Sequence, residues 1–329
     1  MSKIEIHLNL GENDHDPQKF VNAAVYAEEM GFKTVWFGDH IFPWFHSGKR
    51  SSFVWPMLSV ALEKTDHLTV GPWVTVPIGA RYHPALIAQA AATIDNMYPG
   101  RLLLGVGSGE AINERPFWND MWPNWSERMD RLVEGIQLMR KLFTTMEPFS
   151  FNGKYFSSQF YYLYTKPKKA IPIYFSAIGR RAARWAGECG DGLITICPRN
   201  NIQTLQERIL PAYREGRRRV GKRDLGPIAI ELNYSFKTPE EIVRTEWRRL
   251  GIYRKNSWSI STPIAVEEEG KHITVEDVRR NTHLCRTWND VISRIEEYSA
   301  IGVTSFALFS GADKRRIQAI ANNVLNVFN

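Results

Sequence analysis

Short apolar segments alternate with longer amphipathic ones along most of the chain. Eight of the short segments are rich in aliphatic, β-branched and aromatic residues, and most of them lack the regular polar positions of a half-exposed strand. This pattern is typical of parallel strands that are buried on both faces. The predicted strands are residues 4–8, 34–37, 68–75, 102–106, 173–176, 192–196, 228–234 and 305–309.

The longer segments carry apolar residues at helical spacing, and some begin with proline, which fits the first turn of a helix. Because strands and helices alternate about eight times, we expect an α/β fold of the (β/α)8 TIM-barrel type, with a doubly wound sheet as the alternative. A hairpin is predicted around residues 151–154. The predicted helices are residues 17–30, 56–64, 84–97, 126–143, 180–189, 202–220, 239–250, 275–280 and 288–300, and a closing helix after 309.

The length of 329 residues allows either two average domains or one barrel, since barrels run from roughly 200 to over 400 residues. No linker rich in Gly, Ser or Pro divides the chain. We therefore expect a single barrel domain from 1 to 329. Residues 247–281 are polar and lack a clear strand, which predicts an insertion that covers the barrel mouth.

Lysine and arginine outnumber aspartate and glutamate by 42 to 35, a formal charge of +7. This excess favours an acidic ligand or a nucleic acid, and a solvated basic surface explains it equally well. The basic run at 213–224 lacks interleaved aromatic residues and is typical of a solvated helix face. We therefore expect no nucleic-acid partner.

The three cysteines, Cys189, Cys197 and Cys285, are too few and too scattered for a disulfide framework or a zinc site. We expect no metal. No stretch approaches the ~20 apolar residues of a membrane span, and the segment MSKIEIHLNLGEN lacks the basic and apolar regions of a signal peptide. These features predict a cytoplasmic protein with no membrane partner.

In a barrel, functional side chains follow the carboxyl ends of the strands, because those loops converge on one mouth. His40 stands at such a position beside a carboxylate, and a neutral imidazole there could take a proton near neutral pH. A packing histidine is the alternative. The residues selected by this rule are Asp39, His40, Trp44, Thr75, Val76, Pro77, Gly107, Ser108, Gly109, Glu110, Asn113, Ser176, Ala177, Ile178, Gly179, Pro198 and Arg199.

The sequence GVGSGE at 105–110 forms a glycine-rich exit from the fourth predicted strand. Glycines let the backbone approach a ligand closely, and Glu110 could exchange a proton or could simply cap a helix. The motif lacks the third glycine of the dinucleotide fingerprint and follows the fourth strand instead of the first, which disfavours a nicotinamide coenzyme.

Residues 176–179 precede a predicted helix that begins at Arg180. The backbone N–H groups of such a turn and helix N-terminus form a candidate cradle for a phosphate. An ordinary glycine-containing turn explains the same residues.

Several motifs occur together in order: GDH at 38–40 with Trp44, RYHP at 81–84, AQAAAT at 88–93, YPGR at 98–101 and GVGSGEAINE at 105–114. In these motifs the chain resembles the luciferase-like superfamily, and within it the coenzyme F420-dependent dehydrogenases of the glucose-6-phosphate dehydrogenase and secondary alcohol dehydrogenase type. The resemblance covers nearly the whole chain.

The resemblance implies a homodimer of barrels that passes a hydride between a substrate carbinol carbon and C5 of the deazaflavin. His40 is then expected to take the hydroxyl proton, Trp44 to flank and polarise the substrate oxygen, and Glu110 to manage the proton at the ring. The coenzyme carries a phosphodiester and a glutamate tail, which suits a basic protein. A non-prolyl cis peptide bond is implied at Trp73–Val74. The implied coenzyme-binding residues are Asp39, Trp73, Val74, Thr75, Val76, Gly107, Ser108, Asn113, Ser176, Ala177, Ile178 and Gly179.

In the sugar-phosphate dehydrogenases of this family, two lysines and an arginine hold the substrate phosphate. Arg199 takes the first lysine position, Lys271 is the candidate for the second, and Arg280 stands beside Asn281, which replaces the arginine. An arginine can hold phosphate with two hydrogen bonds. The substrate is therefore open between a sugar phosphate, a secondary alcohol and another hydroxylated acid. An FMN-dependent luciferase-like monooxygenase is the alternative function.

Overall fold

Eight parallel strands form one sheet in the computed structural model, which describes residues 3–11, 16–196, 201–255 and 259–329. The sheet order is β3-β2-β1-β12-β9-β8-β7-β4. Parallel bridges from Val70 to Leu102 and from Thr75 to Val106 join its two edges and close the barrel. The strands are β1 Glu5–Asn9, β2 Thr34–Phe37, β3 Thr69–Pro72, β4 Leu104–Val106, β7 Ile173–Ser176, β8 Gly192–Ile196, β9 Ile228–Leu232 and β12 Ser305–Phe309.

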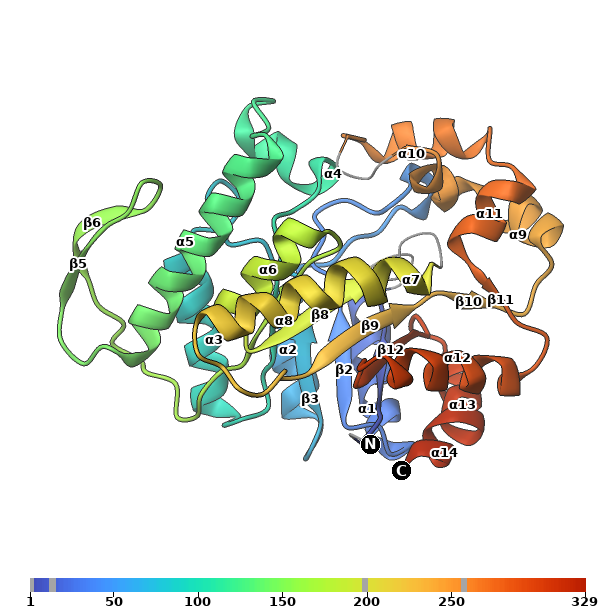
Figure 1. Cartoon of the computed structure of the whole chain (residues 1–329), viewed down its shortest axis with the longest axis horizontal. Coiled ribbons are helices and arrows are strands. Elements are labelled where there is room, and N and C mark those ends of the chain that lie inside the picture. Colours follow the sequence, from blue (N-terminus) through green and yellow to red (C-terminus); the bar gives the residue numbers. More distant parts are fainter. Residues whose placement is uncertain (1–2, 12–15, 197–200, 256–258) are drawn as a thin grey trace.

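All eight predicted strands are therefore present, the (β/α)8 barrel is confirmed, and the doubly wound alternative is wrong. Helices surround the sheet, as Figure 1 shows. The helices that follow the barrel strands are α1 Pro17–Glu29, α2 Val54–Glu63, α3 Pro84–Met97, α4 Ala111–Glu114, α5 Trp125–Thr144, α6 Arg180–Cys189, α7 Ile202–Thr204, α8 Leu210–Arg219, α12 Trp288–Ala300, α13 Lys314–Ile320 and α14 Asn326–Phe328.

The predicted helix at 202–220 is helical throughout, but a π-helical turn, Leu205–Ile209, separates α7 from α8. The predicted hairpin is present as β5 Phe149–Asn152 paired with β6 Ser157–Tyr161. It projects beside α5 in Figure 1 and is held there by Glu134, whose carboxylate accepts backbone N–H groups of residues 154–156 at 2.6–2.9 Å.

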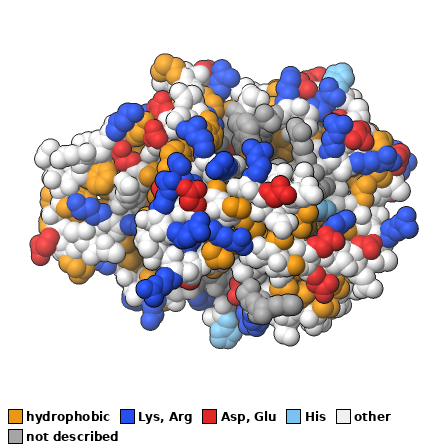
Figure 2. All heavy atoms as spheres, viewed as in Figure 1, with side chains coloured by type: hydrophobic (Ala, Val, Ile, Leu, Met, Phe, Trp, Pro, Cys, Tyr) orange, Lys and Arg blue, Asp and Glu red, His pale blue; other side chains and the backbone are white. Residues whose placement is uncertain are grey.

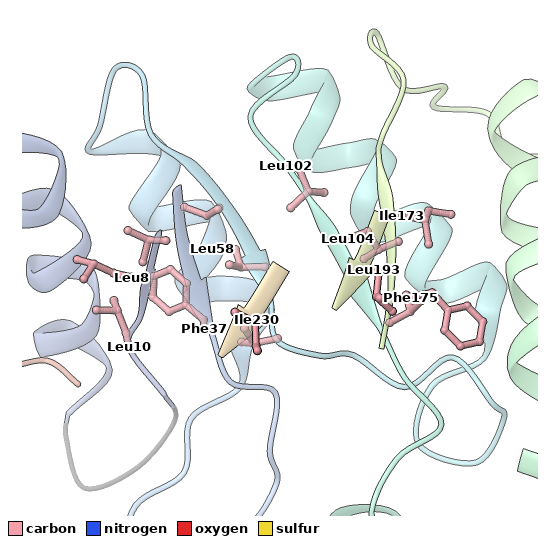
Figure 3. Close-up of a cluster of buried hydrophobic side chains, with 14 of the residues drawn as sticks. Leu8, Leu10, Phe37, Leu58, Leu102, Leu104, Ile173, Phe175, Leu193 and Ile230 are labelled. Carbon is pink, nitrogen blue, oxygen red and sulfur yellow. The ribbon is translucent and has the colours of Figure 1, made fainter. Parts of the chain in front are cut away.

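The main core lies between the strands and the surrounding helices. Leu8 and Phe37 of the sheet pack toward Leu58 of α2, and Ile173 and Phe175 belong to the same buried cluster on the other side of the barrel (Figure 3). Each of these side chains is fully buried, in keeping with the mostly apolar strands. The exception is β1, EIHLN, which alternates polar and apolar residues although its His7 and Asn9 are buried as well.

A second cluster fills the inside of the barrel with Trp36, Tyr174, Ile194, Ala229 and Ala307. The Trp36 indole donates a hydrogen bond from Nε1 to Nδ1 of His7 at 3.1 Å, and its ring lies edge-on to Trp73 with centroids 5.1 Å apart. The barrel is thus a packed core. Any ligand must lie above this layer, at the ends of the strands.

Between β9 and α12 the chain makes a long excursion that contains the predicted insertion. It begins and ends at two short strands that pair in parallel, β10 and β11. Its middle helix was not predicted, because only Val266 and Gly270 of its eight residues are buried and the apolar periodicity is weak. The elements are β10 Tyr234–Ser235, α9 Pro239–Glu246, a 3₁₀ segment Trp247–Tyr253, α10 Pro263–Gly270, α11 Val275–Asn281 and β11 His283–Leu284.

The excursion contacts the carboxyl end of the barrel. Ile260 and Val266 pack with Ile112 and Trp44 in one small apolar cluster. The backbone N–H of Ser47 donates a hydrogen bond to Glu267 at 2.8 Å. Within the described residues, no helix is long and apolar enough to cross a bilayer, and no group of three or more His, Cys, Asp or Glu side chains could hold a metal ion.

Candidate active site

The segment that follows β2 carries His40, and hydrogen bonds hold its backbone on both sides of that residue. Because two carbonyl groups and one N–H group of this segment are bonded to other loops, those loops help to set the position of the imidazole. The bonds run from Arg81 Nη2 to the Asp39 carbonyl at 3.0 Å, from Ser51 Oγ to the His40 carbonyl at 2.9 Å, and from the Ile41 N–H to Asn113 Oδ1 at 3.3 Å.

Three predicted catalytic side chains converge at this point. The Nε2 atom of His40 lies 3.9 Å from Oε2 of Glu110. The rings of His40 and Trp44 are 4.7 Å apart between centroids, tilted by 57°. Glu110 occupies the N-cap position of α4, but its side chain makes no capping hydrogen bond there. Its carboxylate is therefore directed to the site and not to the helix.

Burial determines the charge of the imidazole. Removal from water, with a smaller contribution from the positive charge of Arg81, lowers the pKa of His40 to about 3. The ring is therefore neutral across the physiological range. A neutral imidazole carries a lone pair on one of its ring nitrogens, and this nitrogen can act as a base toward a substrate hydroxyl.

A buried network of charged side chains adjoins the site. The guanidinium of Arg81 lies between two carboxylates, with Nη1 3.4 Å from Oδ1 of Asp39 and Nη2 2.9 Å from Oε1 of Glu114. The side chains are 6%, 1% and 1% exposed, respectively. The hydroxyl of Tyr82 donates to Oδ1 of Asp39 at 2.9 Å. One cation thus serves two carboxylates, an imbalance that favours protonation of one of them.

The pKa of Glu114 reflects that imbalance. Burial, helped by the negative charges of Asp39 and Glu110 and opposed by Arg81, raises the pKa of Glu114 to about 8. The folded protein then holds a proton on this carboxyl that the unfolded chain releases near its ordinary pKa of about 4.3.

This shift predicts a pH-dependent stability. Because the folded pKa is raised, the contribution of Glu114 to the free energy of unfolding is complete below the unfolded pKa and is lost as the pH rises through about 8. Glu114→Gln should flatten the fall in stability between pH 5 and pH 9, measured by urea unfolding. Glu147→Gln, the same change at an exposed position, is the control. Equal losses in the wild type and in Glu114→Gln would contradict the assignment.

The segment after β3 forms a bulge whose peptide bond between Trp73 and Val74 is cis, as the family resemblance implied. The Thr75 N–H donates to the Gly105 carbonyl at 2.9 Å, and the Gly107 N–H donates to the Thr75 carbonyl at 2.9 Å. A Cβ atom on Gly107 would lie 2.7 Å from Val74 Cγ2. The missing side chain of Gly107 therefore serves the close packing of the bulge on β4, in addition to any approach of a ligand.

The predicted coenzyme-binding residues fall into two groups by exposure. Those with accessible surface at the strand ends can touch a ligand with their side chains, whereas the buried ones can act only through backbone atoms or by shaping the site. Their contacts with a coenzyme stay predictions. Trp73, Val74, Ser108, Ser176, Ile178 and Gly179 are partly or fully exposed, and Asp39, Thr75, Val76, Gly107, Asn113 and Ala177 are buried.

The N-terminus of α6 fits a phosphate group. Gly179 is its N-cap residue and no side chain caps the helix. A Cβ atom built on Gly179 would meet nothing within 4 Å, so there is open space beside the first turn. Uncapped N–H groups of a helix, together with its dipole, favour an anion at this position.

The described part of the chain shows no shared site for the predicted substrate-binding cations. Arg199 lies outside the described residues. Lys271 pairs with Glu268 at 2.7 Å and is 52% exposed, and Arg280 pairs with Glu276 at 3.0 Å and is 60% exposed. Both pairs are between neighbours on the helical surface, so substrate contact by either cation stays a prediction.

Arg81, Tyr82 and Glu114 lie in the recognised motifs but received no role from the sequence. Arg81 is the single Lys, Arg, Asp or Glu of the mostly apolar stretch 76–89, which is a signal, whereas Glu114 stands among polar residues and gives none. Glu231 was missed altogether, although a carboxylate inside the apolar strand IAIEL is a similar signal. It accepts a hydrogen bond from Nδ2 of Asn9 at 3.2 Å, and burial raises its pKa.

The chain matches the model of the luciferase-like monooxygenase family over residues 2–305. It is 33% identical to the F420-dependent glucose-6-phosphate dehydrogenase of Segniliparus rotundus over 319 residues, 95% of this chain and 94% of that protein. It is 34% identical to the enzyme of the same name from Rhodococcus erythropolis over 307 residues, 91% of this chain and 90% of that protein.

A solved structure of an F420-dependent secondary alcohol dehydrogenase, in complex with an F420-acetone adduct, superposes with a TM-score of 0.88 and 31% identity over 99% of both chains. The match to the family model and the long relatives above 30% identity are consistent with the closed parallel barrel. This chain belongs to the luciferase-like monooxygenase family.

Proposed function

We propose that this protein is an oxidoreductase that transfers a hydride between a hydroxyl-bearing substrate and the deazaflavin coenzyme F420. The observation that carries the proposal is the convergence of His40, Trp44 and Glu110 at the end of the barrel strands. Relatives named as F420-dependent dehydrogenases, similar over nearly the whole chain, support the choice of coenzyme.

The coenzyme is proposed to lie in the barrel mouth. When bound, the deazaflavin supplies a two-electron acceptor for the hydride, and the protein supplies position and electrostatics. We assign the ring to the bulge at 73–76 and the phosphate to the uncapped start of α6. The inner layer below, with Trp36 in contact with Trp73, gives the ring a rigid floor.

Three side chains carry the proposed chemistry. His40, neutral because it is buried, accepts the hydroxyl proton as the carbinol carbon loses its hydride and becomes a carbonyl carbon. Trp44 flanks the substrate oxygen, and its contact with Ile260 and Val266 of the excursion helps to exclude water. Glu110 exchanges a proton with the edge of the deazaflavin ring.

The substrate is proposed to be a secondary alcohol or a sugar phosphate, the two classes named for the relatives. Arg199, Lys271 and Arg280 are the candidates for holding a substrate phosphate. If Arg199 has this role, Arg199→Ala should raise KM for a phosphorylated substrate about tenfold or more and leave KM for a neutral alcohol unchanged. Equal effects on both substrates in steady-state assays would remove Arg199 from phosphate recognition.

We also propose that residues 1–329 form a single domain, that the segment 247–281 belongs to an insertion over the mouth, and that the protein is a cytoplasmic homodimer. The packing of Ile260 and Val266 against Trp44 supports the insertion.

Light scattering on the purified protein tests the dimer: twice the chain mass of 37.9 kDa is expected, and the single-chain mass would contradict it.

Binding experiments separate the dehydrogenase from the FMN-dependent alternative. The protein should quench the fluorescence of coenzyme F420 on titration, and the bound coenzyme should be reduced by an alcohol or by glucose 6-phosphate without oxygen. Binding of FMN in place of F420, with oxygen consumption in the presence of a flavin reductase, would overturn the proposal in favour of a monooxygenase.

A further inference from the structure

Glu231 is an acidic residue in an otherwise apolar strand of the barrel. Acidic side chains usually lie at the surface, and Figure 2 shows them scattered there among lysines and arginines. Glu231 instead occupies the fourth position of β9, whose other four residues are apolar and buried. Because a carboxyl group inside a barrel loses hydration, it needs hydrogen-bond partners that the strand itself does not supply.

The side chain of Glu231 lies on the inner side of the barrel, at the mouth. Successive residues of a strand face opposite sides. Ile230 and Leu232 belong to the core between strands and helices, whereas Ala229 belongs to the cluster that fills the barrel. Glu231 therefore lies one layer above that cluster. It is partly exposed, and the packed layer below it leaves the mouth as the side from which a ligand can reach it.

Asn9 of β1 holds the carboxyl group in place. Its Nδ2 atom donates a hydrogen bond to Oε2 of Glu231 at 3.2 Å, and its Oδ1 atom accepts one from the backbone N–H of Gly11 at 2.9 Å. The bond from Gly11 determines which end of the buried amide faces Glu231. A carboxyl group that is fixed in this way loses little further freedom when it binds a ligand.

Structural pairing does not account for Glu231. Buried carboxylates that serve stability are usually paired with a cation, as Asp39 is with Arg81. Among the residues that the structure describes, Glu231 forms no ion pair, and the nearby Arg249 of the excursion pairs with Glu246 instead. Asn9 and the indole of Trp73 act as hydrogen-bond donors to the carboxyl group. Since two carboxylate oxygens can accept about four hydrogen bonds, capacity remains for a ligand.

The position of Glu231 in the mouth indicates what that ligand is. Trp73 belongs to the bulge to which we assign the deazaflavin ring, so Glu231 stands beside the place where a substrate meets the ring. His40 follows β2, which β1 and β12 separate from β9. A substrate with its reacting hydroxyl at His40 therefore reaches Glu231 only through a second polar group. The carboxyl oxygens accept hydrogen bonds, which suits a hydroxyl and not a phosphate, whose oxygens are acceptors as well.

We propose that Glu231, positioned by Asn9, binds a second hydroxyl group of the substrate and thereby selects polyhydroxylated substrates over simple secondary alcohols. This inference rests on the proposed function, and it adds a residue that discriminates between the substrate classes named there. A simple alcohol in the same place would shield the carboxyl group from water without offering it a partner. A site built to bind a hydroxyl discriminates strongly against such an analogue.

The test measures kcat/KM with coenzyme F420 for glucose 6-phosphate, for its 2-deoxy, 3-deoxy and 4-deoxy analogues, and for 2-butanol. The wild type should use at least one deoxy analogue about tenfold or more less well than glucose 6-phosphate. In Glu231→Leu, kcat/KM for that analogue and for glucose 6-phosphate should agree within about threefold, because the partner of the missing hydroxyl is gone. The value for 2-butanol should not fall, and the affinity for coenzyme F420 should stay within about twofold.

Glu296→Leu is the matched control, because Glu296 is exposed on α12, and it should keep the wild-type discrimination. If Glu231→Leu does not fold, Glu231→Gln, which keeps the shape and replaces one acceptor oxygen with an NH2 group, should reduce the discrimination about threefold or more.

Unchanged discrimination in the folded variant would overturn the inference, as would a wild type that discriminates against none of the deoxy analogues. An equal loss of kcat/KM for every substrate, 2-butanol included, would assign Glu231 a structural role and overturn it too. Failure of the wild type to bind coenzyme F420, or to reduce it with any of these substrates, would instead overturn the proposed function.

Discussion

Replacing His40 with alanine is expected to lower kcat by about 10²- to 10⁴-fold, the usual cost of losing a general base, while the affinity for coenzyme F420 changes little. The imidazole is a proton acceptor beside Glu110 and Trp44, and burial keeps it neutral. Its removal leaves the hydroxyl proton without an acceptor. Stopped-flow reduction of the bound coenzyme measures the chemical step directly.

His46→Ala is the matched control, because His46 lies in an exposed 3₁₀ turn close in sequence to the site. It should retain the wild-type rate. Thermal melting of His40→Ala should show that the variant is folded. Turnover within a few-fold of wild type in that folded variant would show that His40 is not the base.

Replacing Arg81 with methionine is expected to cost about 3–5 kcal/mol of folding free energy, because it leaves the buried carboxylate of Asp39 without its cation and the buried carboxyl of Glu114 without its hydrogen-bond partner. Asp39 and Glu114 are each 1% exposed, so water cannot take the place of the guanidinium. The loss also removes the hydrogen bond to the Asp39 carbonyl beside His40. Urea unfolding at pH 7 measures the stability change.

Two further variants make that result specific. Arg294→Met removes a half-exposed arginine that pairs with Glu297 at 2.6 Å, and it should cost less than about 1 kcal/mol. Adding Glu114→Gln to Arg81→Met should change the cost little at pH 7, because Glu114, with a pKa raised to about 8, is already protonated there. A cost for Arg81→Met as small as that of Arg294→Met would mean that the network does not hold the site.

The sequence predicted the barrel because parallel strands buried on both faces are hard to mistake. Strands such as IYFS and GLITI have no polar alternation, and their regular spacing by helices leaves few topologies. Helix α10 escaped prediction because it buries Val266 and Gly270 alone and shows no apolar stripe. Its position depends on tertiary contact with Trp44, which local patterns do not encode.

The candidate site, like the fold, was predicted only in part. His40, Trp44 and Glu110 could be selected because they follow strand ends or lie in a recognised motif. The role of Gly107 in accommodating Val74 could not, because that contact joins segments about thirty residues apart and depends on the bulge at 73–76. The pairing of Arg81 with two carboxylates from different loops is likewise a product of barrel closure.

Hydride transfer to coenzyme F420 is the central claim, and isotope transfer tests it most directly. The protein is incubated without oxygen with coenzyme F420 and either 2-propanol deuterated at C2 or glucose 6-phosphate deuterated at C1. We predict that the deuterium of a substrate appears at C5 of the reduced deazaflavin, seen by NMR, with a slower rate than for the protonated substrate. Reduced coenzyme that carries no deuterium from either substrate, or no reduction with either, would contradict the claim.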